Sequence, residues 1–242
     1  MHRGPGFRDR LQGDTLFVNY QRVLEDSFDY TGNILRGGWV RWLQLIASVI
    51  VFPLIYGYSV RVMSGAKPEP ELEGWIRLFI DGIKLLVISI VYSIPLIILM
   101  LLPLVLYLTP VSTTTTPAGA SSGGLIDPGL GIFVALAFFV ICILAVIVLG
   151  ILATFAVVRF ARTGRMREAF RFRAILAHIK RIGWLNVFVA LLVLTVVITV
   201  AQVILSLIPI IGWLLFFLLT PAFIIFASRY LALLYESAPA PV

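Results

Sequence analysis

Residues 159–181 read RFARTGRMREAFRFRAILAHIKR and contain eight of the chain's 19 Lys and Arg residues. Long uncharged runs flank this stretch, over 130–158 before it and over 182–228 after it. Each run exceeds the roughly 20 apolar residues that a helix needs to cross a bilayer. This alternation predicts membrane helices joined by a basic loop, and the loop's charge then indicates which way the helices are inserted.

The composition agrees with a membrane protein. The chain of 242 residues is 60% hydrophobic with a mean hydropathy of +1.04, and only 13% of it is charged, against about 25% in soluble domains. We therefore interpret the net charge of +7 as the charge of cytoplasmic loops and expect no nucleic-acid partner. A single cysteine, Cys142, and two histidines far apart predict no disulfide framework, no metal site and no cofactor.

The predicted fold class is an all-α polytopic membrane protein. Four transmembrane helices are expected at 85–108, 130–158, 184–207 and 213–235. They form a single membrane domain, 37–235, that also contains a basic cytoplasmic loop, 159–183. Pro209 and Gly212 mark a tight turn that makes a hairpin of the last two helices. A short tail, 236–242, follows.

The segment 42–60 is apolar but interrupted by Pro53, which predicts a re-entrant or short helical hairpin segment. Because lipid cannot satisfy an irregular backbone, we expect the four spans to cover it. Residues 1–36 are predicted to be a cytoplasmic tail with an amphipathic helix. Its apolar residues recur at helical spacing from Leu16 to Phe28, and Thr31-Gly32-Asn33 is expected to end it.

Loop charges decide the orientation. If 42–60 crossed the membrane, the basic residues outside the spans would be divided between the two sides. If it dips in and returns, all of them lie on one side, which the positive-inside rule favours. The sequence therefore predicts a multi-pass protein of the cell membrane with cytoplasmic N- and C-termini. The Thr/Ser-rich loop 109–128 and the Pro209 turn then lie outside.

The basic loop is the first candidate site. We expect one helix from Arg165 to Lys180, because apolar residues at spacings of three and four lie on one face: Met166, Ala169, Phe172, Leu176 and Ile179. Such a helix can lie at the interface with its cations on anionic lipid headgroups, or dock a membrane protein partner. The alternative is a topology signal without a binding role. The candidate contacts with lipid or partner are Arg162, Arg165, Arg167, Arg171, Arg173, Lys180 and Arg181.

A second group of charges is predicted to be structural. Asp81 and Lys84 are three residues apart at the mouth of a span, and Arg159 and Arg229 end two other spans on the same side. A partly desolvated carboxylate requires a cation. We therefore expect Asp81 to pair across the bundle with Arg159 or Arg229, with Lys84 as the local alternative. Gly82 should allow a neighbouring helix to approach closely.

Polar residues within the spans are few. Thr195, Thr199 and Gln202 share one face of the fourth span, at i, i+4 and i+7, and are expected to hydrogen-bond between helices rather than to line a polar path. His178 has no carboxylate at a recognisable spacing and is interpreted as an interfacial side chain. Walker and HExxH motifs are missing from the sequence, so we predict a protein that is not an enzyme.

Several stretches together resemble a known family. They are Gly57-Tyr58 followed by Arg61, then Trp75 with Phe79–Gly82, then Arg159-Phe160-Ala161 through Gly164 to Ala169-Phe170, and Ile208–Trp213. Their order and spacing are similar to those of the mainly archaeal membrane family catalogued as domain of unknown function 4013. The resemblance covers roughly 37–235. It implies an archaeal multi-pass protein and supplies no activity.

Two functional hypotheses follow from the sequence. The first is a non-enzymatic membrane protein that organises lipid or scaffolds a partner, which the basic helix and uncharged spans favour. The alternative is a permease or channel-like subunit of a transport system, because kinked spans and a re-entrant segment can line cavities.

Overall fold

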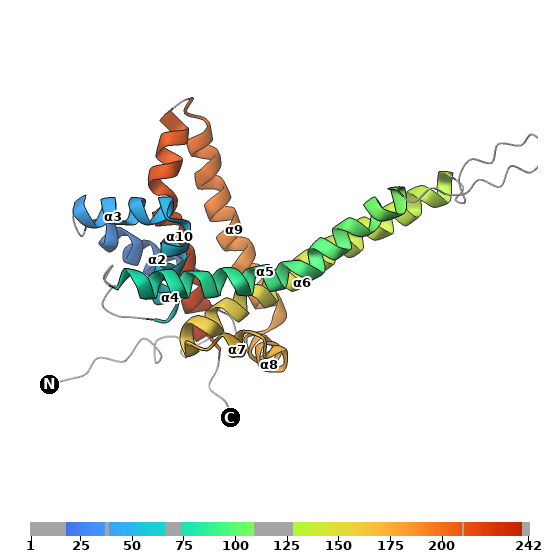
Figure 1. Cartoon of the computed structure of the whole chain (residues 1–242), viewed down its shortest axis with the longest axis horizontal. Coiled ribbons are helices and arrows are strands. Elements are labelled where there is room, and N and C mark those ends of the chain that lie inside the picture. The colour runs from blue at the N-terminus through green and yellow to red at the C-terminus, as the bar shows by residue number, and fades with distance from the viewer. Residues whose placement is uncertain (1–17, 37–38, 66–73, 109–127, 210, 239–242) are drawn as a thin grey trace, which may run out of the picture. The chain divides into compact units, whose positions relative to one another are not determined.

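A computed structural model describes residues 18–36, 39–65, 74–108, 128–209 and 211–238. All regular structure in these ranges is α-helical (Figure 1). The helices are α2 (Tyr20–Arg36), α3 (Trp39–Ile50), α4 (Phe52–Met63), α5 (Trp75–Leu108), α6 (Pro128–Thr163), α7 (Met166–Ala169), α8 (Phe172–Ile182), α9 (Trp184–Ser206) and α10 (Ile211–Glu236). Residues 1–17, residues 66–73 and residues 109–127 of the Thr/Ser-rich loop lie outside the described residues.

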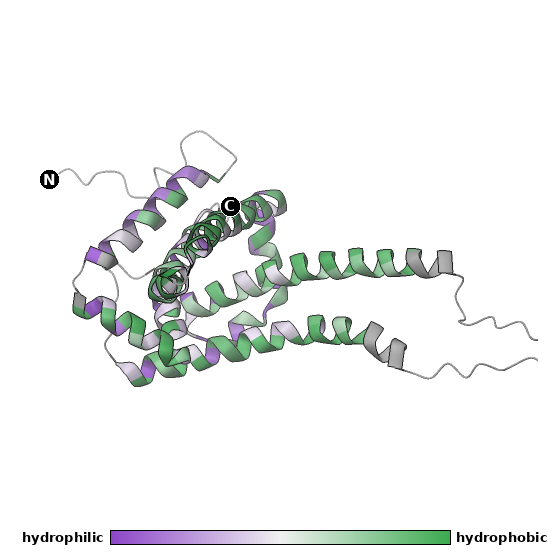
Figure 2. Cartoon of the chain, turned by 90° about the horizontal axis from the view of Figure 1, so that it is seen from above, coloured by the Kyte–Doolittle hydropathy of each residue, from purple (hydrophilic) through white to green (hydrophobic). Residues whose placement is uncertain are grey.

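Four of these helices are long and apolar enough to cross a membrane: α5, α6, α9 and α10. Figure 2 shows the hydrophobic colouring that runs along the long helices. The predicted fold class, an all-α polytopic membrane protein, is confirmed. Two bounds differ from the prediction. Residues 75–84 and the predicted span 85–108 form one continuous helix, and α6 extends to Thr163 rather than ending at 158.

The chain divides into two compact units. The first contains residues 1–89 and 152–242, and the second contains residues 90–151. In the first unit, a buried apolar cluster joins side chains from α2, α3, α4, α5 and α10, with Tyr58, Ile55 and Ile225 fully enclosed. The second unit consists of the end of α5 and the beginning of α6. The predicted single domain over 37–235 remains a prediction.

The apolar segment around Pro53 forms two helices. The helical backbone is interrupted at Val51 (φ −89°, ψ 78°), and Pro53 lies in the first turn of α4, where its missing N–H is not needed. α3 and α4 have 12 residues each, about 18 Å, which is too short to cross a 30 Å hydrocarbon layer. The predicted proline interruption is present, and re-entry remains a prediction that these lengths favour.

The expectation that protein covers the whole of this segment is wrong for α3. Most of α4 is buried, but Leu43 and Ile50 of α3 are exposed. The reason is that α3 satisfies its own backbone as a regular helix, so its outer apolar face can contact lipid at no hydrogen-bonding cost.

Two glycines allow α4 and α5 to approach closely. A Cβ atom on Gly82 would overlap the carbonyl oxygen of Pro53 and lie 3.0 Å from the backbone nitrogen of Gly57. A Cβ atom on Gly57 would overlap the carbonyl oxygen of Leu78. The backbones therefore touch where side chains are missing. The predicted close approach at Gly82 is confirmed.

Helix α2 packs on α10 and is longer than the sequence predicted. It continues through Thr31-Gly32-Asn33 to Arg36, so the predicted stop is wrong. Among the described residues, nothing outside the local turn of the helix lies within 4 Å of the position that a Cβ atom on Gly32 would take, and tertiary contacts hold the helix on either side of it. Its buried face carries Val23, Ser27, Tyr30 and Ile34, while Phe28 is largely exposed and contacts Phe226 at a centroid distance of 4.6 Å.

Candidate functional site

The basic loop contains two helices rather than one. α7 ends at Ala169 and α8 begins at Phe172, so the predicted single helix from Arg165 to Lys180 is wrong. Gly164 (φ 66°) and Gly183 (φ 98°) terminate the segment at both ends, in conformations that other residues rarely adopt. The break turns α8 relative to α7, which changes the residues that share a face.

The inward face of α8 is apolar and packed. Ile175, Ile179 and Ile182 are buried together with His178. Arg173, Leu176, Ala177 and Lys180, at spacings of three and four, form the outward face and are all exposed. The five residues of the predicted apolar face therefore do not share one face. Ala169 and Ile179 pack inside the protein, whereas Phe172 (50% exposed) and Leu176 (40% exposed) face outward.

His178 joins α8 to the end of α10 and is not the interfacial side chain that the sequence predicted. Its Nε2 lies 3.0 Å from the carbonyl oxygen of Tyr235, and its ring stacks on the Tyr235 ring at 3.9 Å. With Nε2–H donating to that carbonyl, Nδ1 accepts from Arg181 at 3.4 Å. Burial lowers the pKa of His178, and the nearby charges of Arg181 and Arg159 lower it further. The arrangement therefore fits a neutral, structural imidazole.

Some of the arginines in the basic loop form ion pairs with carboxylates. Arg159 donates to Glu168 at 2.7 Å, and Arg171 donates to the other oxygen of Glu168 at 2.8 Å. The hydrogen bond from Arg159, followed by the charge of Arg171, lowers the pKa of Glu168. Arg162 pairs with Glu236 at the end of α10. These pairs attach the loop to α6 and α10 and leave Arg159 and Arg162 as structural residues.

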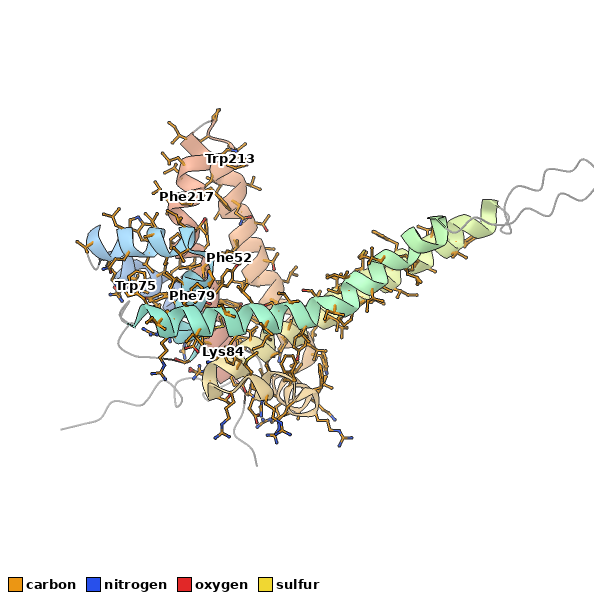
Figure 3. All side chains as sticks on the ribbon, in the orientation of Figure 1. Phe52, Trp75, Phe79, Lys84, Trp213 and Phe217 are labelled. Carbon is orange, nitrogen blue, oxygen red and sulfur yellow. The ribbon has the colours of Figure 1, made fainter. Side chains whose placement is uncertain are left out.

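The remaining cations define an outward basic surface. Arg165, Arg167, Arg173 and Lys180 are exposed and make no ion pair within the described ranges. We call these four, with Arg181, Phe172 and Leu176, the basic surface. Figure 3 shows nitrogen-tipped side chains extending away from α7 and α8. Among the predicted contact residues, Arg171 is exposed but paired, and Arg162 faces Glu236.

The predicted pairing of Asp81 across the bundle is wrong, and its local alternative is present. Lys84 donates to Asp81 at 2.9 Å within α5. Arg229, only 2% exposed, is instead held by Asp26 of α2, with its Nε and Nη2 2.8 and 2.7 Å from one carboxylate oxygen. The guanidinium also lies over the Tyr30 ring, 4.8 Å from the centroid.

These partners explain why the sequence prediction failed. Asp26 and Arg229 are 203 residues apart, and the sequence placed Asp26 only in an amphipathic helix of the N-terminal tail. One pattern pointed to the contact. Asp26 and Tyr30 are four residues apart on a helix, so a carboxylate and an aromatic ring share one face, a pair that suits an arginine.

The hairpin turn is where the sequence placed it. α9 ends at Ser206 and α10 begins at Ile211, with Pro209 between them. Gly212 lies in the first turn of α10, where a Cβ atom would overlap the carbonyl oxygen of Leu205. Gly212 therefore permits the close return of the chain.

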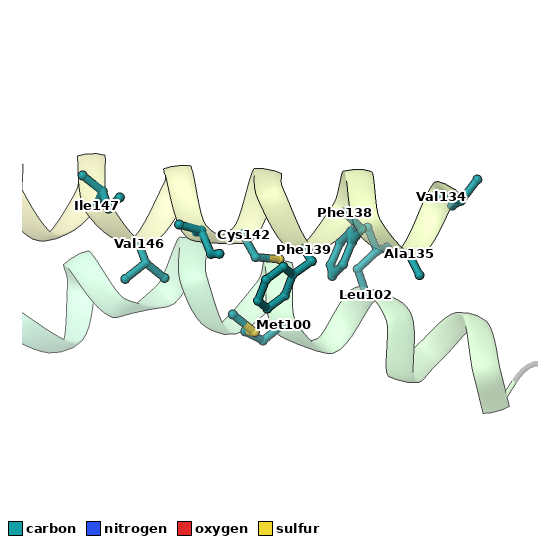
Figure 4. Close-up of a pocket in the computed structure, with 10 residues that line it drawn as sticks. Met100, Leu102, Val134, Ala135, Phe138, Phe139, Cys142, Val146 and Ile147 are labelled. Atoms are coloured by element: carbon teal, nitrogen blue, oxygen red, sulfur yellow. The ribbon is translucent and has the colours of Figure 1, made fainter. Parts of the chain in front are cut away.

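The second unit contains a pocket of about 620 Å³ between the α5 and α6 segments (Figure 4). Side chains such as Met100, Leu102, Phe138, Cys142 and Val146 line it. Since this lining is apolar, it suits an apolar molecule better than an ion or a polar solute. The permease or channel-like alternative remains a prediction. Among the described residues, His, Cys, Asp and Glu do not gather in threes anywhere that a metal could be held.

Comparison with known proteins leads to one family. The model of the family described as "Protein of unknown function (DUF4013)" matches residues 42–210. Searches of curated proteins and of solved structures found no match. The matched range includes α4 to α9 and the whole basic surface, and it leaves α2 and α10 outside.

Proposed function

The chain belongs to the DUF4013 family, and because that membership carries no activity, we propose from its geometry that it is a non-enzymatic integral membrane protein that organises anionic lipid. The observation that carries the proposal is the basic surface. It combines five exposed cations that have no carboxylate partner in the described structure with two exposed apolar side chains, Phe172 and Leu176.

The chemistry of this surface matches a lipid headgroup layer. Each Lys or Arg near an anionic surface contributes about 1 kcal/mol, and that contribution is screened by salt within about 10 Å at 0.1 M. Phe172 and Leu176 can enter the boundary between headgroups and acyl chains. The inward isoleucines of α8 hold the surface rigidly, so the cations are presented without first folding a flexible segment.

The orientation belongs to the same proposal. The basic surface, both termini and Arg229 lie on the cytoplasmic side of the cell membrane, since cytoplasmic loops carry an excess of Lys and Arg. Anionic lipids of the inner leaflet would then be the partner of the basic surface.

The proposal assigns no catalytic residue. His178 and Glu168, the titratable groups of α7 and α8 other than Lys and Arg, are engaged in structural contacts, His178 with Tyr235 and Glu168 with two arginines. If the same cations instead dock a membrane protein partner, the test below should find no preference for anionic lipid.

The test is a lipid titration of the purified full-length protein, followed by native mass spectrometry. We expect more bound phosphatidylglycerol than phosphatidylcholine. The double substitution Arg173→Gln/Lys180→Gln removes two cations from the outward face of α8. At about 1 kcal/mol each, the affinity for phosphatidylglycerol should fall about ten- to thirty-fold.

The matched control is Arg36→Gln/Arg77→Gln, which removes the same charge from exposed positions on α2 and α5. This variant should keep the preference for phosphatidylglycerol. An equal loss in both variants would mean that net charge, rather than the basic surface, attracts the lipid. Equal binding of the two lipids by the wild type would also contradict the proposal.

A further inference from the structure

Helix α9 carries a heptad-type stripe on its exposed side. Six residues follow one another at spacings of 4, 3, 4, 3 and 4, and all of them are exposed: Phe188, Leu192, Thr195, Thr199, Gln202 and Ser206. This spacing is the one with which a helix presents a continuous seam to a second helix at a shallow crossing angle. The first two residues of the seam, Phe188 and Leu192, are apolar, and the four that follow are polar.

The four polar residues of the stripe are unusual in a helix apolar enough to cross a membrane. Thr195 and Ser206 donate to carbonyl groups of α9 itself, Leu191 and Val203. Thr199 and Gln202 make no side-chain hydrogen bond to the described residues. An amide in hydrocarbon without a partner costs several kcal/mol, so Gln202 requires one.

The described residues in the rest of the first unit do not supply this partner. α9 packs through a different face, on which Val187, Ala190 and Leu194 are buried and Tyr230 of α10 donates to the Ala190 carbonyl at 2.9 Å. The described side chains of the second unit offer few polar groups. Tyr92 and Ser93 already have interactions, and Cys142 is buried among apolar side chains.

We propose that the α9 stripe is the interface with a second copy of this chain. Two copies inserted the same way into one membrane have parallel α9 helices. A two-fold axis along the helices then places each stripe residue beside its own counterpart. The Gln202 amide carries both donors and an acceptor, so it can pair with the Gln202 amide of the second copy, and the Thr199 hydroxyls can do the same. The stripe is self-complementary in this parallel arrangement.

Disulfide cross-linking in native membranes tests the interface. In a full-length Cys142→Ser background, single cysteines are introduced as Thr199→Cys, Gln202→Cys or, as the control, Val200→Cys. Val200 is 51% exposed but lies about 100° around the helix from Thr199. We expect a covalent dimer at 199 and 202 and little at 200. Equal cross-linking at all three positions, or none at 199 and 202, would overturn the proposal.

Energy transfer between labelled copies in lipid vesicles tests the proposal without cysteines at the seam. The wild type should dimerise, and Thr199→Val/Gln202→Leu should raise the dissociation constant about 3- to 30-fold. The control Thr220→Val makes the same threonine change on α10, where the hydroxyl donates to its own helix, and should dimerise like the wild type. A monomeric wild type, or a double variant that dimerises normally, would refute the interface.

Discussion

The substitution Gly82→Ala tests the closest helix contact in the structure. The added methyl group would overlap the carbonyl oxygen of Pro53 and lie 2.8 Å from its carbonyl carbon and 3.0 Å from the backbone nitrogen of Gly57. All three atoms belong to the backbone of α4, so no side chain can rotate away. Ordinary van der Waals contact needs at least 3.4 Å, and α4 and α5 would therefore have to separate by about 1 to 2 Å.

The size of the effect follows from two opposing contributions. Overpacking of this kind costs about 1–3 kcal/mol, and the separation also loosens the apolar cluster around Leu78. Alanine favours a helix over glycine by about 0.8–1.0 kcal/mol, which offsets part of this cost. We expect a net destabilisation of about 1–2 kcal/mol and a melting temperature lower by several degrees, measured by scanning fluorimetry in detergent.

Gly32→Ala is the matched control, because among the described residues nothing outside the local turn of α2 lies within 4 Å of the new methyl group. This variant should melt at or slightly above the wild-type temperature, since only the helix preference changes. If Gly82→Ala melts like Gly32→Ala, the close approach of α4 and α5 does not exist in the protein.

Three further predictions concern charge and orientation. The pKa of His178 is lower in the folded protein than in the unfolded chain, so the unfolded chain takes up a proton at higher pH and stability should fall as the pH drops below about 6.5. The melting temperature should therefore be lower at pH 5.5 than at pH 7.5, and His178→Gln should reduce this difference. Asp26→Ala should destabilise the protein by about 3 kcal/mol, because it leaves a buried guanidinium unpaired, and adding Arg229→Met should restore part of the melting temperature. In a background without Cys142, an impermeant thiol reagent added to cells should label Ser121→Cys but not Ser64→Cys; labelling at 64 would make the α3–α4 segment a true span.

The sequence predicted the membrane architecture well because the relevant physics is local. An uncharged run of more than 20 residues requires a helix in lipid, and a proline within a short apolar run interrupts it. The four membrane helices, the interruption before Pro53 and the hairpin at Pro209 follow directly. The role of Gly82 was also predictable. Glycine lowers helix propensity, so a glycine near the start of a membrane helix indicates that the position needs space for a neighbouring backbone.

The charge partners could not be predicted in the same way. Arg229 pairs with Asp26 because α2 packs on α10, and nothing local in either helix reports that packing. His178 was interpreted as an interfacial side chain because no carboxylate lies at a recognisable spacing from it, yet the break at Phe170 turns it toward Tyr235. The same break moved Phe172 and Leu176 outward, which a single continuous helix over 165–180 does not predict.

The central claim is that the outward face of α8 lies on an anionic membrane surface. A spin label at Ala177→Cys, in the Cys142→Ser background, sits on that face between Arg173 and Lys180. In nanodiscs that contain phosphatidylglycerol, the label should be shielded from a water-soluble relaxation agent, and high salt or phosphatidylcholine alone should expose it. Equal exposure of the label in both lipids would contradict the claim.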